Sequence, residues 1–349
     1  MTQQQTALVT GAAGFIGFHV AQRLLADGYR VIGLDSMNDY YDVTLKERRL
    51  QMLCDAPGFS VVRGKLEEPG LLLDTFAQHK PSVVVHLAAQ AGVRFSIDHP
   101  RSYVEANLIG MFELLEAARA HSSAHMLMAS TSSIYGANTK MPYAETDKVD
   151  TQMSFYAATK KANEAMAHSY AHLYGLPTTM FRFFTVYGPW GRPDMALFKF
   201  VAAIQEGRAI DVYNHGNMQR DFTFIDDLVE GVRRLIDVPP PGLADRPEPL
   251  ANDSLSPVAP WRTVNIGNAN PTALGDFIAA IEEAMGQTAE KRYLDMQPGD
   301  VPATWADTSL LTELVGPLPQ TDLKTGISAF VRWYKASYNQ APQDKTPEA

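Results

Sequence analysis

The chain carries two side chains, Tyr156 and Lys160, whose types and spacing suit them to act together as a general base. They begin and end the segment Tyr156-Ala157-Ala158-Thr159-Lys160, so one helical turn would place the phenol and the ammonium on the same face. A neighbouring positive charge lowers the pKa of a phenol. By itself this spacing is more typical of a surface contact, and its interpretation depends on what lies beside it.

A glycine-rich segment near the N-terminus supplies that context. Gly11, Gly14 and Gly17 follow a short apolar strand expected at 6–10 and open a helix expected at 15–27, in the spacing GxxGxxG. In such a turn the first glycine allows a tight bend, the second lets backbone N–H groups approach a pyrophosphate, and the third lets the helix pack on the strand. The sequence therefore predicts a dinucleotide site, and with the Tyr and Lys pair it indicates redox chemistry.

The end of the next expected strand, 29–35, indicates which dinucleotide binds. This strand ends at Asp35. A carboxylate there would accept the adenosine ribose hydroxyls and would repel a 2′-phosphate. Because no arginine follows directly, NAD is favoured over NADP.

Composition excludes several classes of partner. The 349 residues are 46% hydrophobic and 20% charged, which is ordinary for a globular protein, and the net charge of −9 argues against nucleic acid and anionic membranes. The single cysteine, Cys54, excludes an intramolecular disulfide and fits a reducing cytoplasm. The polar start leading directly into a strand predicts no signal peptide, and no apolar run approaches the roughly 20 residues that span a bilayer.

Strands and helices alternate through the first half of the chain. Further strands are expected at 59–64, 82–87 and 125–129, with a long helix at 104–121. This alternation predicts an α/β fold with a doubly wound parallel sheet of the Rossmann type, in which ligands lie at the carboxyl ends of the strands.

The second half of the chain does not keep this regular alternation of strands and helices. A strand at 177–184 precedes an irregular segment at 186–194, and helices are expected at 196–206, 272–285 and 323–338. We expect an NAD-binding domain at 1–182, joined by a later strand and helices, and a smaller α/β substrate-binding domain at 183–338. Residues 238–262 read as a proline-rich loop and 339–349 as a tail.

Two further pairs of residues have ordinary interpretations. His168 and His172 share a helical face but lack a third ligand, so solvated histidines are favoured over a metal site. Arg233 and Arg234 are interpreted as a solvated helix face and not as an anion site.

Taken together, the motifs resemble those of the extended short-chain dehydrogenase/reductase superfamily. The shared features are TGxxGxxG, Asp35, Leu87-Ala88-Ala89-Gln90, Ser130-Thr131-Ser132-Ser133 and YxxxK. Within it the chain is most similar to UDP-glucuronate 4-epimerases, through segments 38–42, 90–94, 183–195 and 220–227. The resemblance runs from about residue 6 to about residue 333.

The resemblance implies an NAD-dependent isomerase that converts UDP-glucuronate to UDP-galacturonate. Tyr156 would take the proton of the sugar 4-hydroxyl as hydride leaves C4, Lys160 would lower the pKa of Tyr156, and Thr131 would bind the same oxygen. The residues that the resemblance assigns to the cofactor are Gly11, Gly14, Phe15, Ile16, Gly17, Asp35, Asn38, Lys65, Leu66, Leu87, Ala88, Ala89, Gln90, Asn107, Ser130, Tyr156, Lys160, Phe183 and Val186.

The substrate carboxylate sets a particular problem, because a 4-keto sugar acid is a β-keto acid and can lose CO2. Arg192 is a bidentate carboxylate partner by type, and related decarboxylases and dehydratases often carry an acidic residue where Ser132 or Ser133 stands here. The resemblance gives the diphosphate to Arg220, the uridine ribose to Asp300 and the uracil to residues 211–213. The full substrate set is Arg94, Thr131, Ser132, Ser133, Tyr156, Thr185, Arg192, Asp211, Tyr213, Arg220 and Asp300.

Departures and alternatives remain open. Lys65 stands where the superfamily usually has an Asp that contacts adenine, and Ser154-Phe155 differs from a common Pro or Leu. Arg220 with Asp221 could be a structural ion pair, and Asp300 a turn residue.

Other functions are a decarboxylase or another UDP-sugar 4-epimerase on this scaffold, or a non-catalytic nucleotide-binding protein. A homodimer is also implied, through the helices at 104–121 and 154–174.

Overall fold

The structure is a computed structural model that describes residues 4–338 apart from positions 245, 247, 249 and 251. The tail expected at 339–349 therefore lies outside the described residues. No described helix is both long and apolar enough to cross a bilayer.

A seven-stranded parallel sheet forms the larger part of the molecule. Its strand order is β10-β6-β5-β4-β1-β2-β3, so the order reverses between β1 and β4. That reversal is where a doubly wound sheet opens a crevice at its carboxyl edge. The α/β Rossmann-type fold is confirmed. The strands are β1 (Thr6–Thr10), β2 (Arg30–Asp35), β3 (Phe59–Arg63), β4 (Val83–His86), β5 (His125–Ala129), β6 (Thr178–Phe183) and β10 (Trp261–Ile266).

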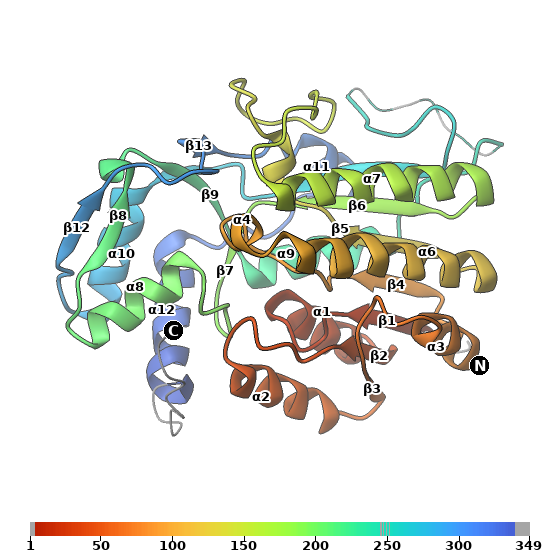
Figure 1. Cartoon of the computed structure of the whole chain (residues 1–349), viewed down its shortest axis with the longest axis horizontal. Helices are drawn as coiled ribbons and strands as arrows, with labels where there is room; N and C mark the ends of the chain where they lie inside the picture. Colours follow the sequence, from red (N-terminus) through yellow and green to blue (C-terminus); the bar gives the residue numbers. More distant parts are fainter. Residues whose placement is uncertain (1–3, 245, 247, 249, 251, 339–349) are drawn as a thin grey trace.

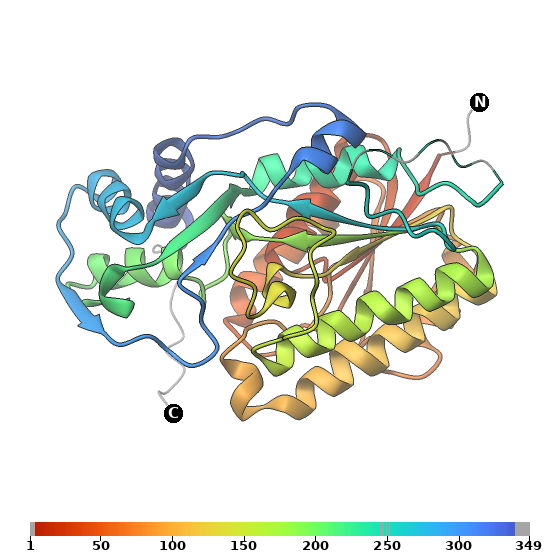
Figure 2. The same cartoon turned by 90° about the horizontal axis from the view of Figure 1, so that it is seen from above.

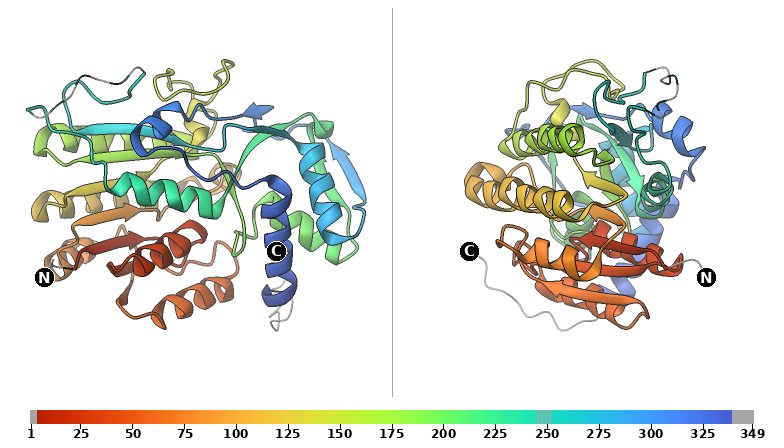
Figure 3. Two further views of the ribbon diagram at one scale, coloured as in Figure 1. Left: turned by 180° about the vertical axis from the view of Figure 1, so that it is seen from behind. Right: turned by 90° about the vertical axis from the view of Figure 1, so that its right-hand side faces the viewer.

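Helices cover both faces of this sheet (Figures 2 and 3). In β1, Ala7 and Val9 join one apolar core while Leu8 joins the other, which is the period-2 alternation that a sheet buried on both faces requires. On the face of Leu8 lie α3 (Leu71–His79), α6 (Gly110–His121) and α7 (Phe155–Tyr174). On the other face lie α1 (Phe15–Ala26), α9 (Ile225–Ile236) and α11 (Ser309–Val315).

The smaller part of the molecule lies beyond the left end of the large sheet in Figure 1. In it, β9 pairs with β7 and β13 in parallel and with β11 in antiparallel orientation, and β8 pairs with β12. Three helices pack against these strands. The elements are β7 (Thr185–Tyr187), α8 (Ala196–Gln205), β8 (Ile210–Tyr213), β9 (Gln219–Phe224), β11 (Pro271–Ala273), α10 (Leu274–Met285), β12 (Lys291–Leu294), β13 (Ala303–Thr304) and α12 (Leu323–Trp333).

Several expected boundaries differ from the structure. The helix expected at 104–121 begins as a π-helix at Val104–Ile109, and the helix expected at 323–338 ends as one at Tyr334–Tyr338. Residues 272–273 belong to β11 because they pair with β9, and residues 261–262, expected in the proline-rich loop, begin β10 because they pair with β6. The last two differences arise because β10 and β11 pair with strands far away in the sequence, and local periodicity does not reveal such pairing.

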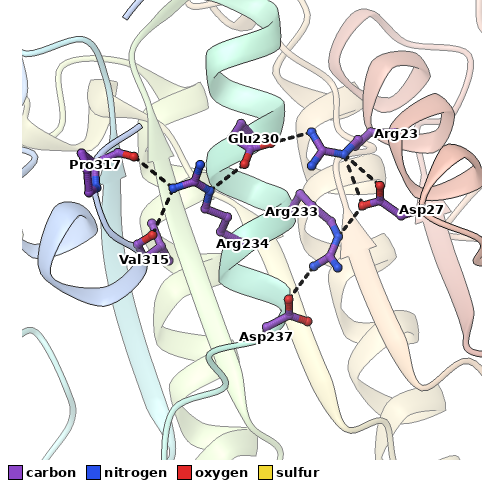
Figure 4. Close-up of polar contacts among 8 residues, drawn as sticks. All are labelled: Arg23, Asp27, Glu230, Arg233, Arg234, Asp237, Val315 and Pro317. Atoms are coloured by element: carbon purple, nitrogen blue, oxygen red, sulfur yellow. Dashed lines mark hydrogen bonds and ion pairs between the residues drawn. The ribbon is translucent and has the colours of Figure 1, made fainter. Parts of the chain in front are cut away.

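An ion-pair network joins α1 to α9 across the second face (Figure 4). Glu230 lies between Arg23 at 2.5 Å and Arg234 at 2.6 Å, and Arg233 lies between Asp27 at 2.6 Å and Asp237 at 2.7 Å. The Arg233–Arg234 pair is thus neither simply solvated nor an anion site, because carboxylates of the chain itself hold both guanidinium groups.

The two helix histidines anchor the loop before β10. His168 Nε2 lies 2.7 Å from the hydroxyl of Ser256, and His172 Nδ1 lies 2.7 Å from the carbonyl oxygen of Val258. Within the described residues no group of three or more His, Cys, Asp or Glu side chains could hold a metal ion.

Candidate active site

The glycine loop crosses the edge of the sheet at the point where the strand order reverses. Gly11 begins the turn after β1 with a φ of +72°, and its N–H donates to the carbonyl oxygen of Leu34 at 2.7 Å. A Cβ on Gly11 would lie 2.9 Å from the nitrogen of Ala88, and one on Gly17 would lie 2.0 Å from the carbonyl oxygen of Gly11. Neither position can carry a side chain without displacing the loop.

The carboxylate of Asp35 fixes the second side of this crevice. Its Oδ2 accepts from the N–H of Ala13 in the glycine loop at 2.9 Å, and its Oδ1 accepts from the N–H of Met37 at 2.9 Å. Each oxygen keeps a further lone pair, so the group can still accept from a hydroxyl. Asp35 lines the cavity beside the glycine loop, where the sequence argument expected it.

One cavity brings together most of the predicted cofactor residues. Its lining includes Gly11, Gly14, Phe15, Ile16, Gly17, Asp35, Asn38, Leu66, Leu87, Ala88, Ala89, Gln90, Ser130, Tyr156, Lys160, Phe183 and Val186. Lys65 is exposed and does not line it, although Gly64, Leu66 and Glu67 around it do. Asn107 lies behind the wall, where its side chain accepts from the N–H of Gln90 at 2.8 Å.

These features fit a dinucleotide. A side-chain-free loop at a helix N-terminus can approach a pyrophosphate, and a fixed carboxylate at the end of β2 can receive a ribose. The loop glycines cannot be replaced without displacing the backbone, which agrees with a site built for close backbone approach.

Tyr156 and Lys160 reach the same cavity from the first turns of α7. The helix begins at Ser154, whose hydroxyl accepts from the N–H of Ala157 at 3.1 Å. The serine that departs from related sequences is thus an N-cap, and capping explains its presence. Lys160 Nζ donates to the carbonyl oxygen of Ala129 at the end of β5, at 2.9 Å.

Burial dominates the proton affinity of both groups. It lowers the pKa of Lys160 to about 8, against the opposing charge of Glu164. Burial raises the pKa of Tyr156, while a hydrogen bond with Thr131 and the charge of Arg192 act in the opposite direction. The net effect of the protein's own groups is therefore a raised phenol pKa, and activation of Tyr156 as a base requires a further positive charge close to it.

Glu164 is a residue that the sequence argument missed. It lies one helical turn beyond Lys160, accepts from the hydroxyl of Ser130 at 2.7 Å, and pairs with Arg182 at 3.0 and 2.9 Å. Both members of this ion pair are almost fully buried. The spacing that identified Tyr156 and Lys160, extended by four residues, would have found it.

Arg192 lines the same cavity as Tyr156 and Lys160, and its guanidinium is already paired. Its Nε and Nη2 donate to the two carboxylate oxygens of Asp194 at 3.0 and 2.5 Å. The hydroxyl of Tyr40 donates to the same carboxylate at 3.2 Å. Burial opposes the charge of Arg192, but Asp194 outweighs it and raises the guanidinium pKa above its usual range.

Two basic residues of α2 (Val43–Cys54) were also missed. Lys46 donates to the carbonyl oxygen and side-chain oxygen of Asn38 at 2.5 and 2.6 Å. Arg49 is fully buried and joins Ala13 of the glycine loop, at 3.0 Å, to the carbonyl oxygens of Trp190 and Gly191, at 2.6 and 3.3 Å. No local pattern reveals contacts that span such distances along the chain.

The residues expected to bind the nucleotide form a second group, outside the lining of this cavity. Arg94 lies 3.0 Å from a carboxylate oxygen of Asp300 and 4.9 Å from the ring centre of Tyr213. Burial lowers the pKa of Arg220, the charge of Asp300 opposes this shift, and the charge of Arg94 adds to it. Asp211 instead pairs with Arg292 at 2.7 Å.

The alternative pairing of Arg220 with Asp221 is not what the structure contains. Asp221 accepts from the N–H groups of Asn268, Ala269 and Ala306 at 2.7, 3.0 and 3.0 Å. Arg220 donates to the carbonyl oxygens of its neighbours Gln219 and Pro302.

Three hydroxyl residues predicted beside Arg192 are not lining residues of the cavity, although they neighbour lining residues in the chain. The N–H of Ser133 donates to the hydroxyl of Thr131 at 3.2 Å, while Ser132 begins the same short 3-10 turn. Thr185 is partly exposed and lies between Phe184 and Val186, which line the cavity. The direct substrate contacts of all three stay predictions.

The site thus combines an acceptor for a proton, a buried ammonium, a dinucleotide crevice and a guanidinium in one cavity. Of the carboxylates among the described lining residues, only Asp35 and Glu67 are present, both on the side of β2 and β3. Such a site can remove a hydride and a proton from an alcohol, and it has no acid positioned for elimination chemistry.

Comparisons with known proteins agree with this chemistry. The model of the NAD dependent epimerase/dehydratase family matches residues 7–245. The chain is 54% identical over 334 residues to a probable UDP-glucuronate 4-epimerase of Rhizobium meliloti, covering 96% of this chain and 98% of that one. It is 44% identical to UDP-glucuronate 4-epimerase 4 of Arabidopsis thaliana, covering 96% of this chain and 76% of that one.

The chain is also similar in three-dimensional structure to a solved UDP-glucuronic acid 4-epimerase. The UDP-glucuronic acid 4-epimerase of Bacillus cereus, crystallised with UDP-glucuronic acid and NAD, superposes with a TM-score of 0.84 at 31% identity. The match covers 95% of this chain and 99% of that one.

Proposed function

The chain belongs to the NAD-dependent epimerase/dehydratase family, and we propose that it converts UDP-glucuronate to UDP-galacturonate by inverting C4 through a transient 4-keto sugar. The observation that carries the proposal is one cavity lined by the glycine loop, Asp35, the Tyr156–Lys160 pair and Arg192. The first three elements serve redox chemistry, and the guanidinium selects a sugar acid.

NAD is the cofactor, held by the glycine loop and Asp35. Bound NAD accepts the C4 hydride and returns it to the opposite face of the sugar, so that it is regenerated in each turnover. Its oxidised nicotinamide also supplies the further positive charge that Tyr156 needs. Lys65 remains a proposed neighbour of the adenine, where an ammonium cannot accept a hydrogen bond from the amino group.

Tyr156 is the proposed base. Its phenolate takes the proton of the 4-hydroxyl while hydride leaves C4, and returns that proton when the ketone is reduced. The hydroxyl of Thr131, which lines the same cavity as Tyr156, would bind the same substrate oxygen. Lys160, anchored on the carbonyl oxygen of Ala129, holds a positive charge within the same buried site.

Arg192 is the proposed partner of the sugar carboxylate, with Ser132, Ser133 and Thr185 as neutral donors. An epimerase must hold this carboxylate so that the C5–C6 bond does not align with the carbonyl π system. The cavity favours epimerisation over dehydration, because its only lining carboxylates among the described residues, Asp35 and Glu67, lie on the cofactor side.

The UDP end is proposed to lie on the smaller part of the molecule. Arg94 and Arg220 would neutralise the diphosphate, Asp300 would accept the ribose hydroxyls, and Asp211 and Tyr213 would line the uracil. This assignment accompanies our division of the chain into an NAD-binding domain at 1–182, completed by β10, α9 and α11, and a UDP-sugar domain mainly at 183–338.

A homodimer in the cytoplasm completes the proposal. The outer faces of the π-helix and α6 expose Ile109 and Phe112, and α7 exposes Phe155, Leu173 and Tyr174. Leu173 alone is 63% exposed. Pairing these two helices with their copies would remove that apolar surface from water. The single cysteine fits a reducing compartment.

Tyr156→Phe removes the proposed proton acceptor but keeps the ring. Proton NMR of UDP-glucuronate with the wild type should show the axial H4 becoming equatorial as its large couplings collapse. The variant should turn over about 100- to 10,000-fold more slowly because general-base catalysis is lost. Near-normal inversion by the variant would remove Tyr156 from the mechanism, and no inversion by the wild type would refute the function.

The pH dependence should report Lys160. Its ammonium, with a pKa of about 8, is lost as the pH rises, so kcat/KM should decline above about pH 8. Glu164→Gln removes the charge that opposes deprotonation and should move this decline to lower pH. It should also destabilise the protein by about 3–5 kcal/mol, because Arg182 is left buried without its partner. Glu116→Gln, on α6, is the control, and an unmoved decline in Glu164→Gln would contradict the coupling.

Arg192→Ala should weaken ground-state binding of UDP-glucuronate by about 1.5–3 kcal/mol for each charged hydrogen bond lost. It should also discriminate less against UDP-glucose and release some CO2 with a UDP-pentose. Calorimetry and product analysis test both effects. Arg208→Ala, at an exposed arginine after α8, should change neither. Wild-type affinity and preference in Arg192→Ala would exclude it as the carboxylate partner.

Phe112→Asp should convert the dimer to monomers by placing a charge in the proposed apolar interface. Sedimentation equilibrium measures the mass. Leu243→Asp, at a loop residue that is 60% exposed, should leave the dimer intact. A wild-type monomer would refute the dimer, whereas a Phe112→Asp dimer of unchanged affinity would place its interface elsewhere.

A further inference from the structure

The guanidinium of Arg192 has two edges that can each hold a carboxylate, and the chain already uses one. Asp194 takes the Nε–Nη2 edge through two hydrogen bonds of 3.0 and 2.5 Å. Nη1 makes no hydrogen bond with any described residue, so Nη1 and the outer N–H of Nη2 remain as a second fork. Arg192 lines the cavity, so this second fork is the part available to a ligand.

The residues around Arg192 hold both its side chain and its backbone. Tyr40 donates to Asp194 at 3.2 Å, and the Tyr40 ring also lies against the guanidinium, 6.0 Å from centre to Cζ. Arg49 binds the carbonyl oxygens of Trp190 and Gly191 immediately before Arg192. The pKa of Asp194 stays low in spite of burial because of the charge of Arg192, so the carboxylate is a permanent partner.

We propose that Asp194, oriented by Tyr40, is a positioning residue that restricts Arg192 to its second fork and thereby fixes the plane of the substrate carboxylate. This inference rests on the proposed function. A guanidinium held at one edge cannot rotate, and a carboxylate bound to the other edge by two hydrogen bonds cannot rotate about its C5–C6 bond.

That restraint governs which of two reactions the 4-keto intermediate undergoes. If the C5–C6 bond aligns with the C4 carbonyl, the bond breaks and CO2 leaves. The electron pair forms an enolate across C5 and C4, and O4 takes the proton held by Tyr156. When the ketone forms again, C5 takes a proton from water, O4 returns its proton to Tyr156, and the hydroxide left by the water combines with the released CO2 as bicarbonate. The product is a UDP-4-ketopentose, or a UDP-pentose once the hydride removed from C4 returns. Asp194 thus protects the carboxylate without touching the substrate.

The test is the ratio of CO2 to epimer formed from UDP-glucuronate labelled at C6. Asp194→Asn offers Arg192 one acceptor in place of two, so the guanidinium can turn while its charge remains. We expect a CO2 ratio that rises on the order of tenfold, the effect of about 1.4 kcal/mol between the two paths, with KM for UDP-glucuronate changed by less than about threefold. Tyr40→Phe, which removes only the donor to Asp194, should raise the ratio by a smaller factor.

The controls separate this role from a structural one. Asp276→Asn makes the same charge change on an exposed turn of α10 and should leave the ratio unchanged. If the substrate instead displaces Asp194, then Asp194→Asn should lower KM with an unchanged ratio, which would overturn the proposal. An unchanged ratio in both Asp194→Asn and Tyr40→Phe would also overturn it. If Asp194→Asn does not fold, Tyr40→Phe alone decides. Failure of the wild type to invert C4 would refute the proposed function, which is a distinct result.

Discussion

The buried ion pair between Glu164 and Arg182 determines where the catalytic helix lies. Their side chains are 2% and 3% exposed, and they join α7 to β6 through two hydrogen bonds. Ser130, at the end of β5, donates to the same glutamate. Replacing such a pair by apolar residues is often neutral for stability, whereas losing one partner costs about 3–5 kcal/mol. What an apolar pair could not provide is a negative charge one turn from Lys160, which keeps a buried ammonium protonated at neutral pH.

The same arginine connects the catalytic helix to the later part of the chain. Arg182 donates to the hydroxyl of Tyr135 at 3.0 Å, and that hydroxyl donates to the side chain of Asn265 on β10 at 2.7 Å. The N–H of Asn265 donates in turn to Glu145 at 2.7 Å, and burial raises the pKa of that carboxyl to about 7. These polar contacts therefore join β10, a strand late in the chain, to the ion pair that holds α7.

Sequence reasoning succeeded where a short segment determines its own geometry. The glycine turn, Asp35 at the end of β2 and the Tyr156–Lys160 spacing each follow from one strand–helix connection or one helical turn, and they meet in one cavity because parallel strands end at one edge. All the predicted cofactor residues except Lys65 and Asn107 line that cavity, and their contacts with the cofactor stay predictions. Glu164 could have been predicted from the same i, i+4 helical spacing.

The parts that could not be predicted depend on partners far apart in the chain. Arg49 binds both Ala13 and Gly191, and Tyr40 reaches Asp194, although nothing in the spacing of these residues relates them. The contacts among the residues proposed to bind the nucleotide could not be predicted either, because Asp211 faces Arg292 only after β8 and β12 have paired.

The contrast between the two ends of the site has a physical consequence for specificity. At the glycine loop of the cofactor crevice a Cβ would collide with neighbouring backbone, so the shape of that loop follows from the fold and tolerates few changes. The proposed sugar end depends on side chains: Asp194 holds the Arg192 guanidinium, and Tyr40, 154 residues earlier in the chain, binds Asp194. We propose that a redox site able to remove hydride from any suitably placed alcohol acquires its choice of substrate, and its protection against losing CO2, from those few side chains. On this proposal, selectivity depends on how rigidly Arg192 is oriented, and residues that do not contact the sugar set that orientation.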